Sequence, residues 1–271
     1  MATIISTGNF KGGVGKTTNC VMLAYTLAKM GKKILLVDFD PQSDATKLLM
    51  NTMAKVFDVT PVFETTLAVA LKSGDIESAL INVMPNLDLL PSYSDLQTYE
   101  AFLYDNFDSD FEKDTYFSKQ LNKISDNYDF IFIDVPPQLN KYTDSALTAS
   151  NFVIVILQTQ ERALNGAETF ISHIQTLAED YNLNLDIVGI LPVLVQNGNE
   201  LDQDVLQDAR EIFNEVNLFE STIKQMARLK RFDRTGITEL SSDIHDKRVH
   251  KVYNDVAVEL LQRIEMFNEE A

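Results

Sequence analysis

The chain contains 271 residues, of which 45% are hydrophobic, 23% are charged and 9% are aromatic, and its formal net charge is -17. This length and composition suit one ordinary α/β domain with a full core, predicted to span residues 1–271, and they exclude a disordered chain. The acidity excludes nucleic-acid or membrane binding driven by overall charge, so such binding would need a local basic patch. The single cysteine, Cys20, excludes an internal disulfide, and no apolar run approaches the ~20 residues that span a bilayer, so we expect a cytoplasmic protein.

Short apolar runs rich in Ile and Val predict the buried strands of a parallel sheet. They lack strict alternation of apolar and polar residues, which suits strands covered by helices on both faces. A helix starts at Gly15 and stops at Gly31, so the first forty residues form a βαβ unit with a right-handed crossover. We therefore expect a doubly wound α/β fold, with a mostly parallel sheet flanked by helices. The predicted strands are Thr3–Ser6, Lys33–Asp38, Phe130–Asp134, Phe152–Leu157 and Asp186–Leu191.

The segment from Asn51 to Asn127 is mostly helical in pattern, with turn signals such as Ser73-Gly74 and Pro85-Asn86. It carries an acidic cluster, Asp105–Asp114, which is most simply interpreted as a solvated loop or helix face. No internal repeat, low-complexity tract or linker interrupts the chain, which favours one domain.

A glycine-rich loop lies between the first strand and the first helix, where a phosphate-binding loop belongs. The sequence from Gly8 to Thr18 is GNFKGGVGKTT. Glycines let backbone N–H groups turn toward phosphates, and the helix N-terminus adds a positive dipole end. Lys16 is expected to reach the β- and γ-phosphates of ATP and Thr17 to place its hydroxyl on Mg²⁺. A glycine-rich turn without a ligand is the alternative. The nucleotide-binding residues that this loop predicts are Gly12, Gly13, Val14, Gly15, Lys16, Thr17 and Thr18.

Aspartates stand at the ends of two further predicted strands. Asp38 and Asp40 follow one strand in the sequence DFDPQ, and Asp134 ends another before two prolines. In open α/β sheets ligands sit at the carboxyl ends of strands, so these acids should face the nucleotide. Asp134 is expected to bind Mg²⁺ through water, because Mg²⁺ keeps several of its waters. For Asp38 the alternative is a structural role as the cap of a turn.

Lys11, five positions before Lys16, gives the loop its resemblance to the deviant Walker A loop of the ParA/MinD family. The DFDPQ segment is similar to the switch I of that family, although Ser43-Asp44 replaces the usual Gly-Asn, and Asp134 begins a segment that looks like Walker B and switch II. The resemblance implies an ATP-dependent sandwich dimer in which Lys11 contacts the nucleotide of the other subunit. It implies that Asp40 positions the attacking water and that Asp38 helps to hold the Mg²⁺ shell.

The expected site therefore has Lys11, Lys16 and Asp40 as catalytic residues and Thr17, Asp38 and Asp134 at the metal. Turnover in this class depends on positioning and charge neutralisation, so an ATPase that is slow without a partner is expected. The resemblance thins after Ser150. Gly166 fits the family pattern, but the proline that relatives carry before it is missing. Pro192 and Asn197 are the candidates for adenine contact.

One basic region stands out on this acidic chain, in its C-terminal third. The segment from Ile223 to Gly236 resembles the ParA segment that binds nonspecific DNA, and Arg228 falls where such relatives carry a DNA-contacting arginine. Phosphate contacts of this kind are independent of sequence and sensitive to salt. A solvated basic helix that offsets the acidic surface is the alternative. The predicted DNA-binding residues are Lys224, Arg228, Lys230, Arg231 and Arg234. The basic region also contains Lys247, Arg248 and Lys251, to which no DNA contact is assigned.

Two other function classes fit less well. A MinD-like protein would use a basic amphipathic terminal helix at a membrane. The stretch from Glu259 to Ala271 has an apolar face but carries acids, so we expect it to pack on the domain and expect no membrane partner. A metal-cluster enzyme needs cysteines, and only Cys20 is present.

The resemblance thus implies an ATP-dependent DNA-partition ATPase, with a MinD-like ATPase that positions a protein cargo at a membrane or other surface as the alternative. The expected partners are a second copy of the chain, nonspecific DNA and a ParB-like centromere-binding protein, which would place the protein on the nucleoid. The loop begins at Gly8, so we expect no N-terminal helix-turn-helix domain. Plasmid or mobile-element segregation is favoured over chromosome segregation. The identity of the partner and centromere, the turnover rate and filament formation stay open.

Overall fold

One eight-stranded sheet forms the central layer of the computed structural model, which describes residues 1–196 and 198–270. The strand order is β3-β4-β2-β5-β1-β6-β7-β8, and every neighbouring pair is parallel except β3 with β4. Four predicted strands extend or match their expected bounds, and the remaining one, β2, loses only its first residue. The strands are β1 (Thr3–Gly8), β2 (Ile34–Asp38), β3 (Ile81–Met84), β4 (Leu87–Leu90), β5 (Phe130–Asp134), β6 (Phe152–Gln158), β7 (Asp186–Val195) and β8 (Ile223–Lys224).

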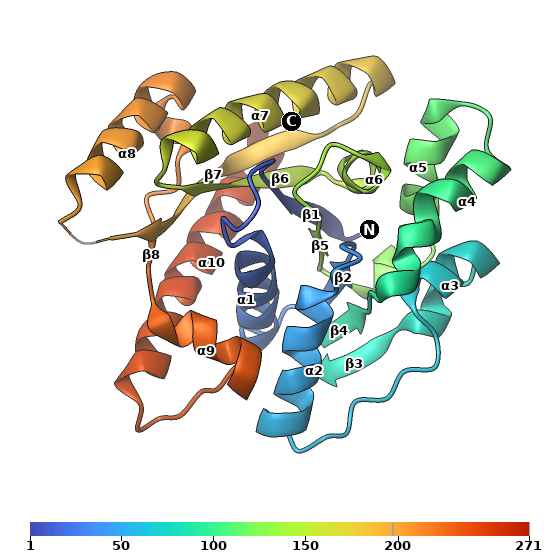
Figure 1. The fold of residues 1–271 in the computed structure, drawn as a ribbon, viewed down its shortest axis with the longest axis horizontal. Coiled ribbons are helices and arrows are strands. Elements are labelled where there is room, and N and C mark those ends of the chain that lie inside the picture. The colour runs from blue at the N-terminus through green and yellow to red at the C-terminus, as the bar shows by residue number, and fades with distance from the viewer. Residues whose placement is uncertain (197, 271) are drawn as a thin grey trace.

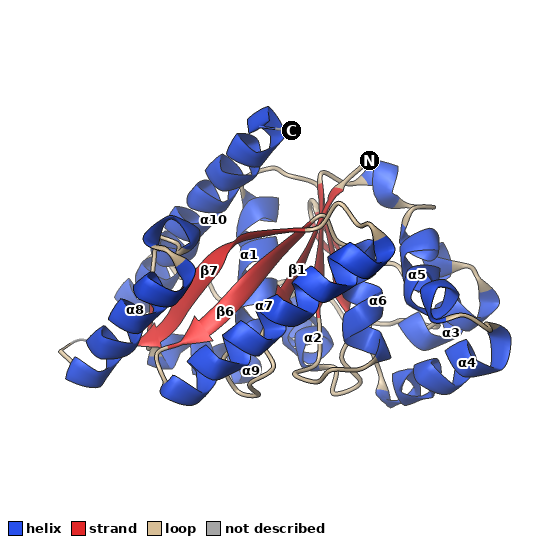
Figure 2. Cartoon of the chain, turned by 90° about the horizontal axis from the view of Figure 1, so that it is seen from above, coloured by secondary structure: helices blue, strands red, loops and turns tan. Residues whose placement is uncertain are grey.

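Helices cover both faces of the sheet (Figures 1 and 2). From β1 the chain moves one way to β2 through α1, and later moves the other way to β6 and β7 through α6 and α7. Right-handed crossovers in opposite directions place α1 and α7 on opposite faces, which makes the fold doubly wound, as predicted. The helices are α1 (Lys16–Lys29), α2 (Asp44–Val56), α3 (Leu67–Ser73), α4 (Tyr99–Asn106), α5 (Asp110–Leu121), α6 (Lys141–Ala149), α7 (Glu161–Tyr181), α8 (Glu200–Phe213), α9 (Ala227–Thr235) and α10 (Ile244–Glu270).

The central strands are buried on both faces, which explains their continuous apolar sequences. Successive residues of β2 alternate between the two cores: Ile34 and Leu36 pack into one, and Leu35 and Val37 into the other. A strand that faces helices on both sides needs no polar face. The pattern therefore predicted burial correctly from the sequence.

The last helix, α10, packs on α1 with a buried apolar face. Tyr253, Val256 and Leu260 are fully buried along it. Leu260 and the buried Ile264 belong to the segment that starts at Glu259, which confirms the expectation that this segment packs on the domain. In the described part of the chain, no helix combines the length and apolar character needed to cross a bilayer.

The segment expected to be mostly helical also contains a β-hairpin that the sequence pattern did not reveal. It holds α3, α4 and α5, but β3 and β4 lie between α3 and α4, and β4 adds to the sheet beside β2. Each strand has only four residues, too few for a periodicity to stand out. The turn signal was present, because Asn86 at the hairpin turn has a left-handed backbone with φ 68°.

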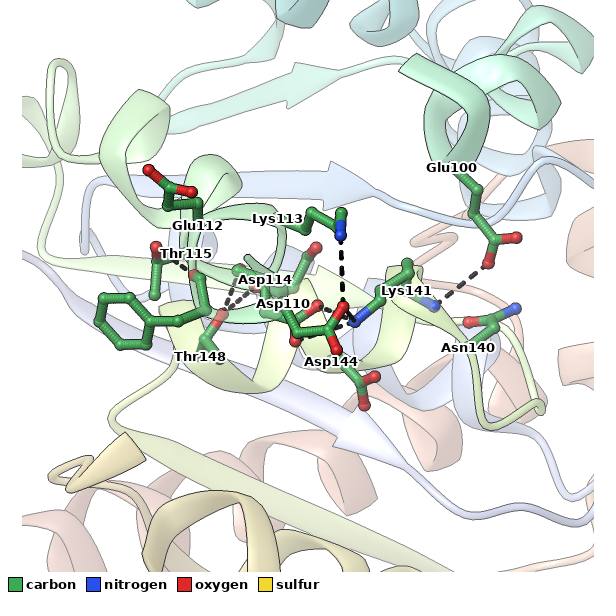
Figure 3. Close-up of polar contacts among 12 residues, drawn as sticks. Glu100, Asp110, Glu112, Lys113, Asp114, Thr115, Asn140, Lys141, Asp144 and Thr148 are labelled. Carbon is green, nitrogen blue, oxygen red and sulfur yellow. Dashed lines mark hydrogen bonds and ion pairs between the residues drawn. The ribbon is translucent and has the colours of Figure 1, made fainter. Parts of the chain in front are cut away.

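The acidic cluster is mostly solvated, as expected, but its last member is not. The Asp114 side chain is 2% exposed, and its carboxylate lies 3.0 Å from Lys141 Nζ. Tyr181 Oη donates a hydrogen bond to it at 2.9 Å. Figure 3 shows Lys141, at the start of α6, pointing toward both Asp114 and the exposed Asp110 on α5. The assignment of Asp114 to a solvated face was therefore wrong, because it joins α5 to α6 and α7.

Candidate functional site

The carboxyl ends of β1, β5 and β2 meet at one edge of the sheet. In the register of the parallel strands, Asp134 stands opposite both Thr7 of β1 and Asp38 of β2. The glycine-rich loop leaves β1 at this edge. The structure therefore brings the predicted loop and the predicted aspartates together, as the strand order requires.

Residues 9–15 form the loop that leads into α1. Gly13 and Gly15 have φ values of 77° and 90°, a left-handed backbone that side chains rarely tolerate. Gly15 occupies the N-cap of α1, where no side chain caps the helix and no acidic residue lies in the first turn. The N–H groups of this turn are therefore available to an anion, and the helix dipole favours one.

Lys16 folds back over the loop. Its side chain is buried, and Nζ donates to the carbonyl oxygens of Asn9 at 3.0 Å and Lys11 at 3.2 Å. Burial lowers the pKa of Lys16 to about 8, against the opposing effect of the Asp134 and Asp40 charges. Within the described residues this buried ammonium bonds to neutral carbonyls alone, and an anion would be a stronger partner.

Asp134 is the least satisfied charged group at this edge. Its side chain is buried, and neither carboxylate oxygen accepts a hydrogen bond within the described residues. Burial first, and then the charge of Asp38, raise its pKa well above the usual value, with the nearby Thr17 side chain partly offsetting the shift. A buried carboxylate without partners needs a cation or its waters, so this position fits a hydrated Mg²⁺.

Asp38 is engaged differently. Its Oδ2 accepts hydrogen bonds from the backbone N of Thr46 at 2.8 Å and from Thr46 Oγ1 at 2.7 Å, in the first turn of α2. Burial raises its pKa to about 7 in spite of these bonds. Asp38 therefore has the structural capping role that was its alternative, and any part in a metal shell would be shared with that role.

Asp40 lies at the turn between β2 and α2. Its Oδ1 accepts from the backbone N of Gln42 at 2.9 Å, and its own carbonyl accepts from Ser92 Oγ at 2.7 Å. Burial raises its pKa, while the Gln42 bond lowers it in part. The half-buried carboxylate lies at the same edge of the sheet. The hydrogen bond from Ser92, which follows β4, holds the Asp40 segment beside that strand.

No group of three or more His, Cys, Asp or Glu side chains within residues 1–196 and 198–270 forms a metal cage. Mg²⁺ that is bound through phosphates, waters and one or two protein oxygens needs no such cage. The oxygens that fit it belong to Asp134 and Thr17. Of the two candidates for adenine contact, Pro192 is buried inside β7, and Asn197 lies outside the described residues.

The predicted basic region forms two packed helices, α9 and α10. Lys230, Arg231 and Arg234 are exposed on α9, and Lys224 is half-buried in the edge strand β8. Arg228 is placed differently, because its guanidinium pairs with the buried Asp246 of α10 and lies 3.0 Å from Asp243. These ion pairs hold α9 on α10, so the structure gives Arg228 an internal role that competes with contact to a phosphate.

A cavity of about 270 Å³ opens between α9 and α10. Arg231 and the exposed Arg248 line it together with His245 and the edge of Arg228. Arg248 was noted in the sequence as part of the basic region but not selected as a site residue. Its separation of 17 positions from Arg231 carries no helical signal, and only the packing of the two helices brings the guanidinium groups to one cavity.

The basic helix α9 is also fastened to α2, the helix that follows Asp40. Asn51 Nδ2 and Lys55 Nζ donate to the carbonyls of Asp233 and Arg234 at the end of α9. At the following Gly236, an added Cβ would lie 2.7 Å from the Thr52 backbone. The exposed basic surface is thus in direct contact with a helix that begins at the candidate nucleotide edge, the edge of the sheet that holds the glycine-rich loop, Asp38, Asp40 and Asp134.

Known proteins are similar to this chain in sequence and in fold. A family model described as an AAA domain matches residues 2–187. The chain is 30% identical over 261 residues to the sporulation initiation inhibitor protein Soj of Bacillus subtilis, a match that covers 96% of this chain and 98% of that protein.

Two solved structures are similar over nearly the whole chain. A plasmid partition protein of Borrelia burgdorferi bound to AMPPNP superposes with a TM-score of 0.75 at 26% identity, covering 97% of this chain and 99% of that one. Cobyrinic acid a,c-diamide synthase of Mycobacterium smegmatis, with a bound ATP analogue and magnesium, superposes with a TM-score of 0.79 at 26% identity, covering 97% and 95%.

Proposed function

The chain belongs to the ParA/Soj family of P-loop ATPases, and from this premise we propose that it is a DNA-partition ATPase. In this proposal residues 1–271 act as one ATPase domain that dimerises with ATP and Mg²⁺ and binds nonspecific DNA. A ParB-like centromere-binding partner then stimulates hydrolysis and release. The observation that carries the proposal is the content of one edge of the sheet. Among the described residues, this edge holds the uncapped N-terminus of α1, the displaceable Lys16 and the buried Asp134 without a hydrogen-bond partner. The helix α2 connects the same edge to the basic surface of α9.

At the nucleotide, the N–H groups of the loop and of the first turn of α1 would hold the phosphates. Lys16 would exchange the two carbonyls that it now contacts for β- and γ-phosphate oxygens. Mg²⁺, held near Thr17 and Asp134, would neutralise the phosphate charge. Lys11 would reach the nucleotide of the other subunit, and Asp40 would orient the attacking water.

At the DNA, the exposed residues of α9 and Arg248 of α10 would contact phosphates. A single chain carries a formal net charge of -17, so one small basic surface gives weak binding. Two such surfaces joined in a dimer bind far more tightly, since the second contact becomes intramolecular. DNA binding would therefore depend on ATP. The MinD-like alternative loses support because the apolar face of α10 is buried against the domain.

The test is binding of a random-sequence DNA duplex in the presence of ATP, ADP or no nucleotide, across a salt series. The double variant Lys230→Ala/Arg231→Ala removes exposed charges without touching the Arg228 ion pairs. The log–log slope of affinity against salt should become shallower by about one for each phosphate that the variant no longer neutralises. Lys72→Ala/Lys119→Ala, with the same change of charge on α3 and α5, is the matched control and should bind as the wild type does.

ATP-dependent, salt-sensitive binding that is weakened in the α9 variant would support the proposal. Binding that is equal with every nucleotide would contradict the ATP dependence of the DNA contact. Binding that is absent even at low salt would remove DNA as the partner while leaving the ATPase assignment in place. Vesicle binding and pull-down of a protein cargo would then test the alternative.

A further inference from the structure

The loop residue Asn9 is buried and makes bonds in three directions. Its Nδ2 donates to the carbonyl oxygens of Ile156 at 2.9 Å, at the end of β6, and of Ala163 at 3.2 Å, at the start of α7. Its Oδ1 accepts from the backbone N of Lys11 at 2.8 Å. Because both of its donors are used, the amide cannot turn, and its oxygen stays directed at the Lys11 N–H.

Gly166 of α7 leaves the space that this bond needs. A Cβ at position 166 would lie 2.7 Å from Asn9 Oδ1 and 3.4 Å from both the backbone N and the Cβ of Lys11. A glycine inside a helix lowers helix stability by about 1 kcal/mol relative to alanine. At position 166 the glycine is explained by the close approach of the loop to α7, which leaves no room for a Cβ.

Aromatic side chains seat the same loop segment on α7. Phe10 packs edge-on against Phe170 with ring centroids 5.0 Å apart. Phe170 also lies over Gly8, where an added Cβ would fall 2.0 Å from its ring. One face of α7 therefore lies close to the loop from Gly8 to Lys11.

We propose that Asn9 and Gly166 are positioning residues that set the backbone of Lys11 for its role across the dimer interface. This inference rests on the proposed function, in which Lys11 contacts the nucleotide of the other subunit. The Lys11 carbonyl is held only by Lys16 among the described residues, and Lys16 leaves when it binds phosphate. The Asn9 bond occupies the Lys11 N–H and does not depend on Lys16, so it persists when Lys16 moves to the phosphates and directs the lysine in the ATP-bound state.

The experiment compares Gly166→Ala, Asn9→Ala and Lys11→Ala in the full chain. Two readouts are measured: ADP affinity of the monomer, and the dissociation constant of the dimer formed with a non-hydrolysable ATP analogue. Gly166→Ala and Asn9→Ala should leave ADP affinity within about twofold of wild type and weaken the dimer roughly tenfold, the scale of one lost hydrogen bond to a charged group. Asn165→Ala, exposed on the same turn of α7, is the control and should change neither.

The double variant Gly166→Ala/Lys11→Ala separates positioning from a general structural effect. If Gly166 acts through Lys11, the double variant dimerises no worse than Lys11→Ala alone. A further weakening in the double variant, a loss of ADP affinity, or wild-type dimerisation by both Gly166→Ala and Asn9→Ala would each overturn the inference. Wild-type dimerisation by Lys11→Ala would instead contradict the proposed function. Asn9→Ala covers the case in which Gly166→Ala does not fold.

Discussion

Two buried aspartates lie in very different surroundings. Asp114, on α5, lies 3.0 Å from Lys141 Nζ of α6 (Figure 3). It also accepts a hydrogen bond from Tyr181 Oη. Asp134, at the end of β5, has no hydrogen-bond partner for either oxygen among the described residues. Burial raises the pKa of both carboxyls, but for Asp114 Lys141 and Tyr181 oppose the shift, while for Asp134 the charge of Asp38 adds to it.

The difference distinguishes Asp114, which stabilises the fold through an ion pair, from Asp134, whose position suits binding of a ligand. A buried charge is costly unless it is paired, so an unpaired buried carboxyl takes up a proton, as the raised pKa of Asp134 favours, or is completed by a bound cation. Removing a partner should therefore destabilise the Asp114 region. At the nucleotide edge, substitutions should impair ligand binding while sparing the ligand-free fold.

The largest effect is expected from Lys16→Ala. The variant loses the main cationic partner of the β- and γ-phosphates, so ATP-dependent dimerisation should fall below detection. Its thermal unfolding without nucleotide should stay close to that of the wild type, because Lys16 Nζ bonds only to two carbonyls within the described chain. Gel filtration with ATP and Mg²⁺ measures the first and calorimetry the second. A persistent ATP dimer would contradict the assignment of the loop.

Asp134→Asn tests the aspartate that has no hydrogen-bond partner among the described residues. Replacing the carboxylate by a neutral amide removes its repulsion with Asp38, so the ligand-free variant should unfold at or above the wild-type temperature. Affinity for ATP in the presence of Mg²⁺ should fall about 100-fold, the scale of one missing charge-assisted interaction. Titration calorimetry with Mg²⁺ and with EDTA is the measurement. If EDTA weakens wild type and variant equally, Asp134 does not serve the metal.

Lys141→Met should show the opposite behaviour. It leaves the Asp114 carboxylate with Tyr181 as its one side-chain partner among the described residues, which should lower the free energy of unfolding by about 2 kcal/mol. The loss is smaller than for a fully buried pair because Lys141 is partly exposed. Urea denaturation measures the change. Adding Asp114→Asn should restore part of the loss. Lys119→Met, on α5, should stay within about 0.5 kcal/mol of wild type. Equal losses of unfolding free energy in Lys141→Met and Lys119→Met would contradict a specific stabilising role for the Asp114–Lys141 pair.

The smallest effect is expected from Thr148→Val. Thr148 Oγ1 donates to the backbone carbonyl of Asp114 at 2.6 Å (Figure 3). Losing this bond at constant volume should cost about 1 kcal/mol of unfolding free energy, without any change in nucleotide binding. Urea denaturation and titration with ATP measure the two quantities. A larger effect on ATP affinity than on stability would show that this region is coupled to the nucleotide edge and would weaken the comparison.

Much of the nucleotide edge could be predicted because its signals are local in the chain. The loop, Asp40 and Asp134 each lie at the end of a strand, and the rule that ligands sit at the carboxyl ends of parallel strands places them together. Arg228 shows where this reasoning stops. Its position in a basic segment predicted a phosphate contact, but its partner Asp246 lies 18 positions away on another helix. No local pattern carries that pairing.

The amino-acid order by itself determined the parallel strands, the phosphate loop and the acidic residues at the strand ends, because each depends on periodicity or on backbone preferences within a few residues. Tertiary structure alone decided which buried charges are paired. It pairs Asp114 with Lys141 and directs the Asp38 carboxylate to Thr46 in the first turn of α2. It leaves Asp134 without a hydrogen-bond partner among the described residues. The physical reason is that pairing depends on distances between groups far apart in the chain, and only the packing of helices on the sheet sets those distances.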